Sequence, residues 1–96
     1  MEYNYPIRND WTTEEIIEVI AFYDSVEKAY EIGIERTELI EKYRAFKKIV
    51  PTKSEEKTLF KEFEDASGYI CFTIIKAATE RTDEKKIFGK NKTNPY

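Results

Sequence analysis

The chain has 96 residues, of which 36% are charged and 41% hydrophobic, and its formal net charge is −3. This composition fits one globular domain and excludes a disordered polymer or a strongly basic nucleic-acid binder. The chain contains no histidine and one cysteine, so it lacks the side chain that dominates acid–base chemistry near neutral pH and cannot form an internal disulfide.

The first helix is predicted between Thr12 and Gly33. Thr12 is a favourable N-cap residue, and Glu15 three positions later completes a capping box. Apolar residues then recur at steps of three and four from Ile16 to Tyr30, which is the spacing of one helix face. Gly33 can adopt the left-handed conformation that ends a helix.

Two further helices follow in the middle of the chain. One is predicted from about Arg36 to Ile49, and Pro51 forces its end because the residue before a proline disfavours helical geometry. The next begins after Thr52, which forms a second capping box with Glu55, and it ends at residues 67–68, where a serine precedes a glycine.

Residues 69–80 have the character of both a strand and a helix. Residues 69–75 are rich in β-branched and aromatic side chains, yet Ile70, Ile74 and Ala77 also fall on one helical stripe. The sequence predicts no second strand anywhere in the chain to pair with this segment, so a fourth helix is predicted.

These elements predict an all-α fold, a small irregular bundle of about four helices with an extended aromatic arm at residues 3–7. We expect a single helical domain over residues 1–84 and a flexible basic tail over residues 85–96, which Ile87 and Phe88 are able to tether.

Six short motifs occur in a specific order and spacing: Tyr5-Pro6, residues 10–15 (DWTTEE), Phe22-Tyr23, residues 26–30 (VEKAY), residues 43–47 (YRAFK) and Ser67-Gly68-Tyr69. Over roughly residues 3–78 this pattern resembles the YktA-like uncharacterised protein family of Gram-positive bacteria. The resemblance implies a small, soluble, all-helical protein of irregular bundle architecture. It implies no activity and no catalytic residue.

The sequence shows no reaction centre. Cys71 lies in an apolar run without a basic neighbour to activate it, so a buried structural cysteine is expected. Acidic residues cluster around the start of the first helix at Asp10, Glu14, Glu15 and Glu18, where they favour the helix dipole more than they favour a metal. We therefore expect no enzymatic activity, no catalytic residue, no cofactor and no metal.

Two surfaces are candidates for contact with a partner. The aromatic arm and the wide apolar face of the first helix suggest an interface at Tyr3, Tyr5, Trp11 and Phe22, although the same residues also suit a bundle core. A column of lysines on the third helix, with two more before Pro51, is a candidate patch for an anionic partner, or else a solvated face: Lys47, Lys48, Lys53, Lys57 and Lys61.

The leading hypothesis is therefore a non-enzymatic cytoplasmic protein-interaction or regulatory module, with a homodimer as one of its forms. The amino-terminal residues lack the pattern of a secretory signal, and the longest apolar run is far shorter than the roughly 20 residues that span a bilayer, so no membrane association is expected. The alternative is a helix-turn-helix-like nucleic-acid-binding protein that uses helices 3 and 4. Nucleic acid is not the expected partner, because the fourth helix region offers only Lys76 and Arg81 as bases.

Overall fold

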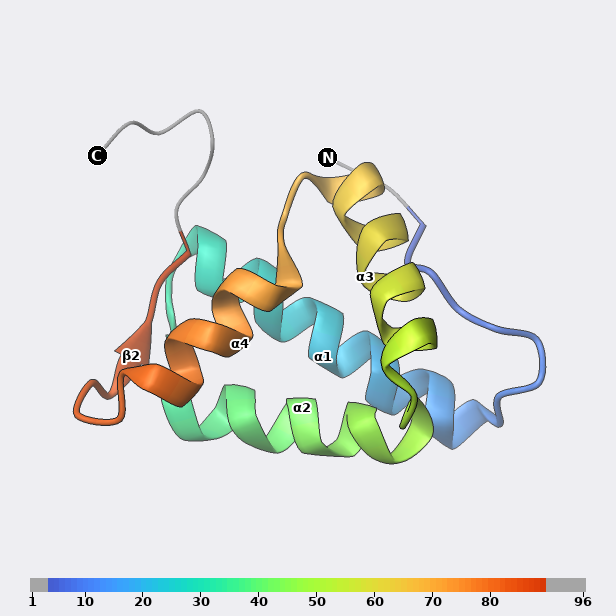
Figure 1. Cartoon of the computed structure of the whole chain (residues 1–96), viewed down its shortest axis with the longest axis horizontal. Coiled ribbons are helices and arrows are strands. Elements are labelled where there is room, and N and C mark those ends of the chain that lie inside the picture. Colours follow the sequence, from blue (N-terminus) through green and yellow to red (C-terminus); the bar gives the residue numbers. More distant parts are fainter. Residues whose placement is uncertain (1–3, 90–96) are drawn as a thin grey trace.

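The computed structural model describes residues 4–89 of the chain. In this part, four helices pack irregularly around one core: α1 (Thr13–Glu31), α2 (Arg36–Ile49), α3 (Lys53–Ser67) and α4 (Cys71–Glu80) (Figure 1). Two short strands, β1 (Ile34–Glu35) and β2 (Lys86–Ile87), form a minor sheet beside them. The all-α class predicted from the sequence is confirmed, and the sheet is an addition to it.

The helix ends follow the local sequence signals. At α1, the Thr12 hydroxyl accepts from the Glu15 amide (3.1 Å) while the Glu15 carboxylate accepts from the Thr12 amide (2.9 Å), which completes the predicted capping box. At α3, the Thr52 hydroxyl accepts from the Glu55 amide (3.4 Å), but the reciprocal bond from the Thr52 amide to the Glu55 carboxylate is not formed, so the second predicted capping box is only half present. Gly33 and Gly68 follow α1 and α3 with φ angles of 90° and 84°, a region that side chains with a Cβ rarely adopt.

Aromatic rings dominate the core. Phe22 of α1 packs on Phe46 of α2 with ring centroids 5.0 Å apart, and Tyr23 stacks on Phe63 of α3 at 4.8 Å. Phe46 also stacks on Phe60 of α3 at 5.3 Å, so the rings join three helices. Such pairs add stability beyond the burial of their area.

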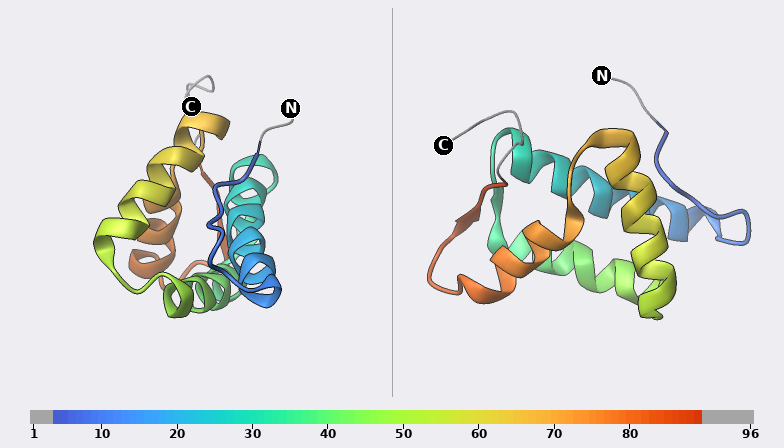
Figure 2. Two further views of the ribbon diagram at one scale, coloured as in Figure 1. Left: turned by 90° about the vertical axis from the view of Figure 1, so that its right-hand side faces the viewer. Right: turned by 45° about the horizontal axis from the view of Figure 1, so that its top comes forward.

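The aromatic arm lies across α1 and α3, as predicted for the part that the structure describes (Figure 2). The ring of Tyr5 stacks on Tyr23 at 5.6 Å and on Phe63 at 6.2 Å. The Tyr23 hydroxyl donates to the Pro6 carbonyl (3.0 Å), and Arg8 forms an ion pair with Glu62 of α3 (3.1 Å). The arm thereby fills the space between these two helices.

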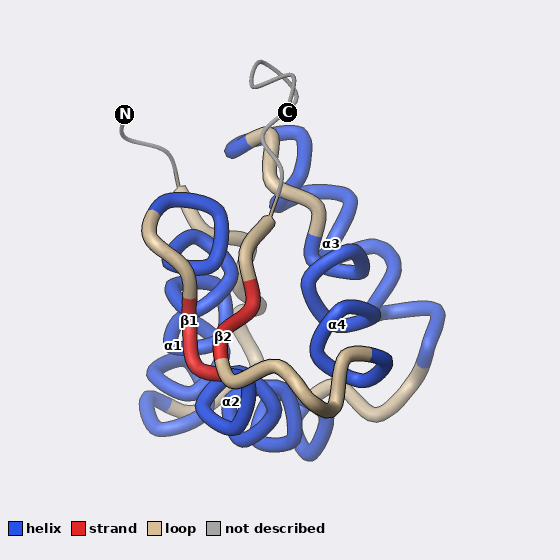
Figure 3. The backbone as a smooth tube through the Cα atoms, turned by 90° about the vertical axis from the view of Figure 1, so that its left-hand side faces the viewer, coloured by secondary structure: helices blue, strands red, loops and turns tan. Residues whose placement is uncertain are grey.

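The segment after α4 departs from the predicted tail. Strand β2 lies beside β1 (Figure 3). The two strands pair antiparallel, with Ile87 opposite Ile34, and the Ile87 side chain is fully buried. The Gly89 amide adds a hydrogen bond to the Ala29 carbonyl (3.0 Å). Residues 85–89 therefore belong to the folded unit, and the boundary predicted at residue 84 is too early. The rest of the predicted tail, from residue 90, lies outside the described residues.

Candidate functional site

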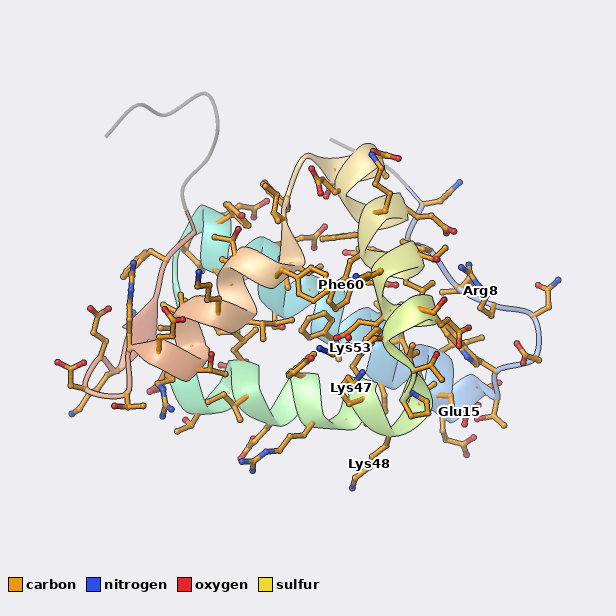
Figure 4. All side chains as sticks on the ribbon, viewed as in Figure 1. Arg8, Glu15, Lys47, Lys48, Lys53 and Phe60 are labelled. Atoms are coloured by element: carbon orange, nitrogen blue, oxygen red, sulfur yellow. The ribbon has the colours of Figure 1, made fainter. Side chains whose placement is uncertain are left out.

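Helices α2, α3 and α4 border one open face of the molecule. In Figure 4, the side chains of Lys47, Lys53 and Phe60 point into the space between these helices, whereas Lys48 points away from it. Helix α4 runs above α2 in Figure 1. A hydrogen bond from Arg36 to the Ala78 carbonyl joins the two helices. This face contains a groove between α2 and α4.

The groove lies between α2 and α4 and has a volume of about 340 Å³. Its floor consists of the buried side chains of Leu39 and Ala78. Its apolar walls are the half-buried side chains of Ile40, Tyr43 and Ile75. The remaining lining residues, at its edges, are Arg36, Arg44 and Thr79. An apolar cleft with a few polar groups at its edge is the usual form of a binding site.

The sequence of α2 explains the composition of this groove. Arg36, Ile40, Tyr43, Arg44 and Lys47 recur at steps of three and four residues, so they share one side of the helix. That side carries three basic residues and no acidic residue, and no acidic residue lines the groove. The groove therefore combines an apolar floor with a positively charged edge.

The two arginines at the edge differ in their surroundings. The Arg36 Nε donates to the Ala78 carbonyl at 2.6 Å, close to the end of α4, where helix carbonyls lack partners within the helix. Arg44 is exposed and forms no ion pair or hydrogen bond with any other residue in the range 4–89. Arg36 thus joins the two helices, while the charge of Arg44 is available to a partner.

A buried carboxylate on α3 holds one of the residues that line the groove, Tyr43. Glu56, in the first turn of α3, is 2% exposed and accepts from the Tyr43 hydroxyl (2.7 Å) and from the Lys47 ammonium (3.2 Å). Burial raises the pKa of Tyr43, and its hydrogen bond to Glu56 adds to that increase. The cluster ties α2 to α3 and fixes the Tyr43 ring in the wall of the groove.

The five lysines predicted as an anionic-partner patch do not gather into one free surface. Lys47 is paired with the buried Glu56, and Lys61 is paired with Asp65 at 3.0 Å. Lys48 points away from the open face (Figure 4). Lys53 and Lys57 are exposed and form no ion pair with a residue in the described part of the chain.

The predicted aromatic interface needs a correction at Phe22. Its side chain is 0% exposed in the core, so it cannot touch a partner, and the prediction for this residue is wrong. Tyr5 and Trp11 are half-buried and pack against the core. Tyr3 lies outside the described residues. Tyr5 and Trp11 therefore stabilise the bundle, and the outer face of α1 keeps Ile17 (60% exposed) as its exposed large apolar residue.

The predicted state of Cys71 agrees with the structure. Its side chain is buried, and burial raises the pKa of its thiol well above the ordinary value. Within residues 4–89, no three side chains of the types that ligate metals gather closely enough to hold an ion. No helix in this range is both long enough and apolar enough to cross a bilayer.

Helix α4 presents little charge for contacts with phosphate groups. Ile74 is fully buried, and Ile70 and Ala77 are half-buried. The exposed positions of α4 carry one base, Lys76, together with the acidic Glu80. A recognition helix in a DNA groove relies on exposed polar and basic side chains, so this geometry does not favour the helix-turn-helix alternative.

The groove itself was absent from the sequence-based predictions. A column on α2, with Arg36, Ile40 and Arg44 four residues apart, is the signal that points to it. In the sequence, this column is typical of a helix edge that faces solvent. The groove forms only because Ile75 and Ala78 of α4 lie against α2 in the folded chain.

Comparison with known proteins confirms the resemblance noted in the sequence. The sequence model of the family described as "Uncharacterised protein family (UPF0223)" matches residues 2–87. The UPF0223 protein YktA of Bacillus subtilis is 54% identical over 87 residues, which cover 91% of this chain and 98% of the relative. A relative from Lysinibacillus sphaericus is 52% identical over 83 residues, which cover 86% of this chain and 87% of the relative. A relative from Staphylococcus saprophyticus is 46% identical over 92 residues, which cover 96% of this chain and 100% of the relative. The chain therefore belongs to the uncharacterised family UPF0223.

Proposed function

We propose that this protein is a non-enzymatic interaction module that binds a segment of another protein in the groove between α2 and α4. The observation that carries the proposal is the combination of half-exposed apolar walls with an arginine, Arg44, that has no partner in the described part of the chain. We place the protein in the cytoplasm, where an unpaired cysteine stays reduced.

The groove suits a peptide segment because it is open to solvent and is lined by residues of two helices, α2 and α4. Ile40, Tyr43 and Ile75 offer apolar surface that a partner can cover, and aromatic and arginine side chains are enriched where proteins meet. An amphipathic segment laid between two helices is a recurring mode of peptide recognition.

The test is capture of partners from Bacillus subtilis cytosol, since that bacterium contains a relative that is 54% identical. The immobilised protein is compared with two groove variants, Ile75→Asp and Arg44→Glu, by quantitative mass spectrometry. We expect the captured amount of at least one protein to fall about tenfold or more with both variants. A buried charge in the wall of the groove and a reversed charge at its edge each oppose binding.

The matched control is Ile17→Asp, which places the same charge on the outer face of α1, where the side chain is 60% exposed. Circular dichroism checks that every variant is folded. The proposal fails if every captured protein is recovered in the same amount with the groove variants as with Ile17→Asp. Self-association that Arg44→Glu leaves unchanged would place a dimer interface elsewhere and would also count against the groove.

A further inference from the structure

The chemistry of the groove also specifies the kind of segment that fits it, an inference that rests on the proposed function. Arg36, Ile40 and Arg44 follow one another at single-turn steps along α2. Eight residues of helix correspond to about 12 Å, so the two guanidinium groups originate two turns apart with an isoleucine midway.

The charges at the two ends are able to act on a ligand. The Nε of Arg36 donates a hydrogen bond to the Ala78 carbonyl. The two terminal nitrogens of Arg36 make no hydrogen bond with another residue in the range 4–89. Arg44 makes none at all within the same range. A guanidinium presents a rigid fork of donors that matches a carboxylate, so both ends favour acidic side chains.

The centre of the groove has the opposite character. Ile40, Tyr43 and Ile75 surround it, and the hydroxyl of Tyr43 is already committed to Glu56. No charged group lines the groove between the two arginines. The surface therefore alternates, over two helical turns, from positive to apolar and back to positive.

From this alternation we infer that the ligand is an amphipathic helix with an acidic residue at each end of a two-turn face and an apolar residue between them. Positions i, i+3 or i+4, and i+7 lie on one side of a helix. Seven residues correspond to about 10.5 Å, which is close to the separation of the two arginines along α2. The motif is acidic at i, apolar at i+3 or i+4, and acidic at i+7.

The experiment is selection from a displayed library of helical peptides about 20 residues long, with all positions of one face randomised. The full-length protein is the target, and the selected peptides are measured by titration calorimetry against the wild type, Ile75→Asp, Arg44→Glu and Ile17→Asp. We expect enrichment of the acidic–apolar–acidic motif and a loss of affinity of about tenfold or more with Arg44→Glu.

A charge exchange separates a direct contact from a general effect of charge. Replacement of one acidic residue of the peptide by lysine should weaken binding to the wild type, and for one of the two positions it should restore part of the binding to Arg44→Glu. Ile17→Asp should leave every affinity unchanged.

The outcomes distinguish the inference from the proposed function. Peptides that depend on Ile75 but carry no paired acidic residues, or that are insensitive to Arg44→Glu, would overturn the inference and leave the groove as a binding surface. If no selected peptide depends on Ile75, both are wrong. Binding of a duplex DNA probe that Arg44→Glu abolishes, in the absence of peptide binding, would likewise overturn both.

Discussion

At the scale of single residues, the least ordinary feature is the buried carboxylate of Glu56. A carboxylate removed from water needs hydrogen-bonding partners, and Glu56 has them in Tyr43 and Lys47. Every buried side-chain nitrogen or oxygen in the described part of the chain has a hydrogen-bond partner, so this cluster fits a fully satisfied interior. Its hydrogen bond to Tyr43, which lines the groove, couples the stability of the bundle to the shape of the binding surface.

Replacement of Lys47 by alanine should therefore be costly. The change leaves the buried charge of Glu56 with one partner, Tyr43. Because the Lys47 side chain is 28% exposed, the pair is only partly buried, and the free energy of unfolding should fall by about 2 kcal/mol. Urea denaturation provides the measurement. Lys48→Ala is the matched control, because Lys48 is exposed and points away from the cluster, and its effect should stay within about 0.5 kcal/mol. Equal effects of the two substitutions on the free energy of unfolding would show that the ion pair of Lys47 with Glu56 does not stabilise the fold.

Residue-level predictions from sequence succeeded where the determining contacts are local. The capping box of Thr12 and Glu15 depends on atoms three residues apart, and the structure contains it. The exposure of Phe22 depends on which side of α1 meets α2 and α3. Because α1 is apolar around a wide arc, its sequence does not reveal that side, and Phe22 was wrongly assigned to a surface.

At the scale of elements, the connection of β2 to β1 decides how far the folded unit extends. Ile87 is 0% exposed and lies opposite Ile34, and the Arg36 amide, at the start of α2, donates to the Lys85 carbonyl (2.7 Å). The carboxy-terminal segment thus holds the junction of α1 and α2, which is where Arg36 contacts α4. This segment therefore anchors the start of α2, where Arg36 borders the groove.

The substitution Ile87→Ala should lower the free energy of unfolding by about 3 kcal/mol, since it leaves a cavity in a fully buried position. Thermal and urea denaturation measure the effect. Ile17→Ala removes the same atoms from a side chain that is 60% exposed and should change the stability little. If Ile87→Ala behaves like Ile17→Ala, residues 85–89 would be the flexible tail that the sequence suggested.

The sheet escaped sequence-based prediction for a physical reason. A strand of two residues has no alternating pattern to detect, and its pairing joins positions that lie more than fifty residues apart. Helices α1, α2 and α3 were predictable because each extends over several turns and carries its own start or stop signal. Helix α4 has no capping signal and was predicted from its apolar stripe instead. The groove depends on the way α4 lies on α2, which no local signal encodes.

At the scale of the whole molecule, the tyrosines link stability to alkaline pH. Burial raises the pKa of Tyr23 and Tyr43 above the ordinary value of tyrosine, and burial together with a hydrogen bond to Glu31 raises the pKa of Tyr69 to about 12. Tyrosines in the unfolded chain lose their protons near pH 10, so above that pH the folded state holds more protons than the unfolded state.

The free energy of unfolding should therefore be constant up to about pH 9 with respect to these groups and should fall as the pH rises above about 10. The fully buried Tyr23 alone should contribute a slope of about 1.4 kcal/mol per pH unit. Urea denaturation across this range gives the slope, and Tyr69→Phe should make it shallower between about pH 10 and about pH 12. Stability that does not change above about pH 10 would contradict the burial of these rings.

The central claim is that partners bind at the groove between α2 and α4. Its most direct test is photo-crosslinking in Bacillus subtilis cells that express this protein with p-benzoylphenylalanine in place of Thr79, a residue at the edge of the groove. The same substitution at Thr13, exposed at the start of α1, is the control. We predict a discrete heavier adduct from position 79 that Arg44→Glu abolishes, and none from position 13. Adducts that form equally from both positions, or none from position 79, would contradict the assignment of this groove as the interaction surface.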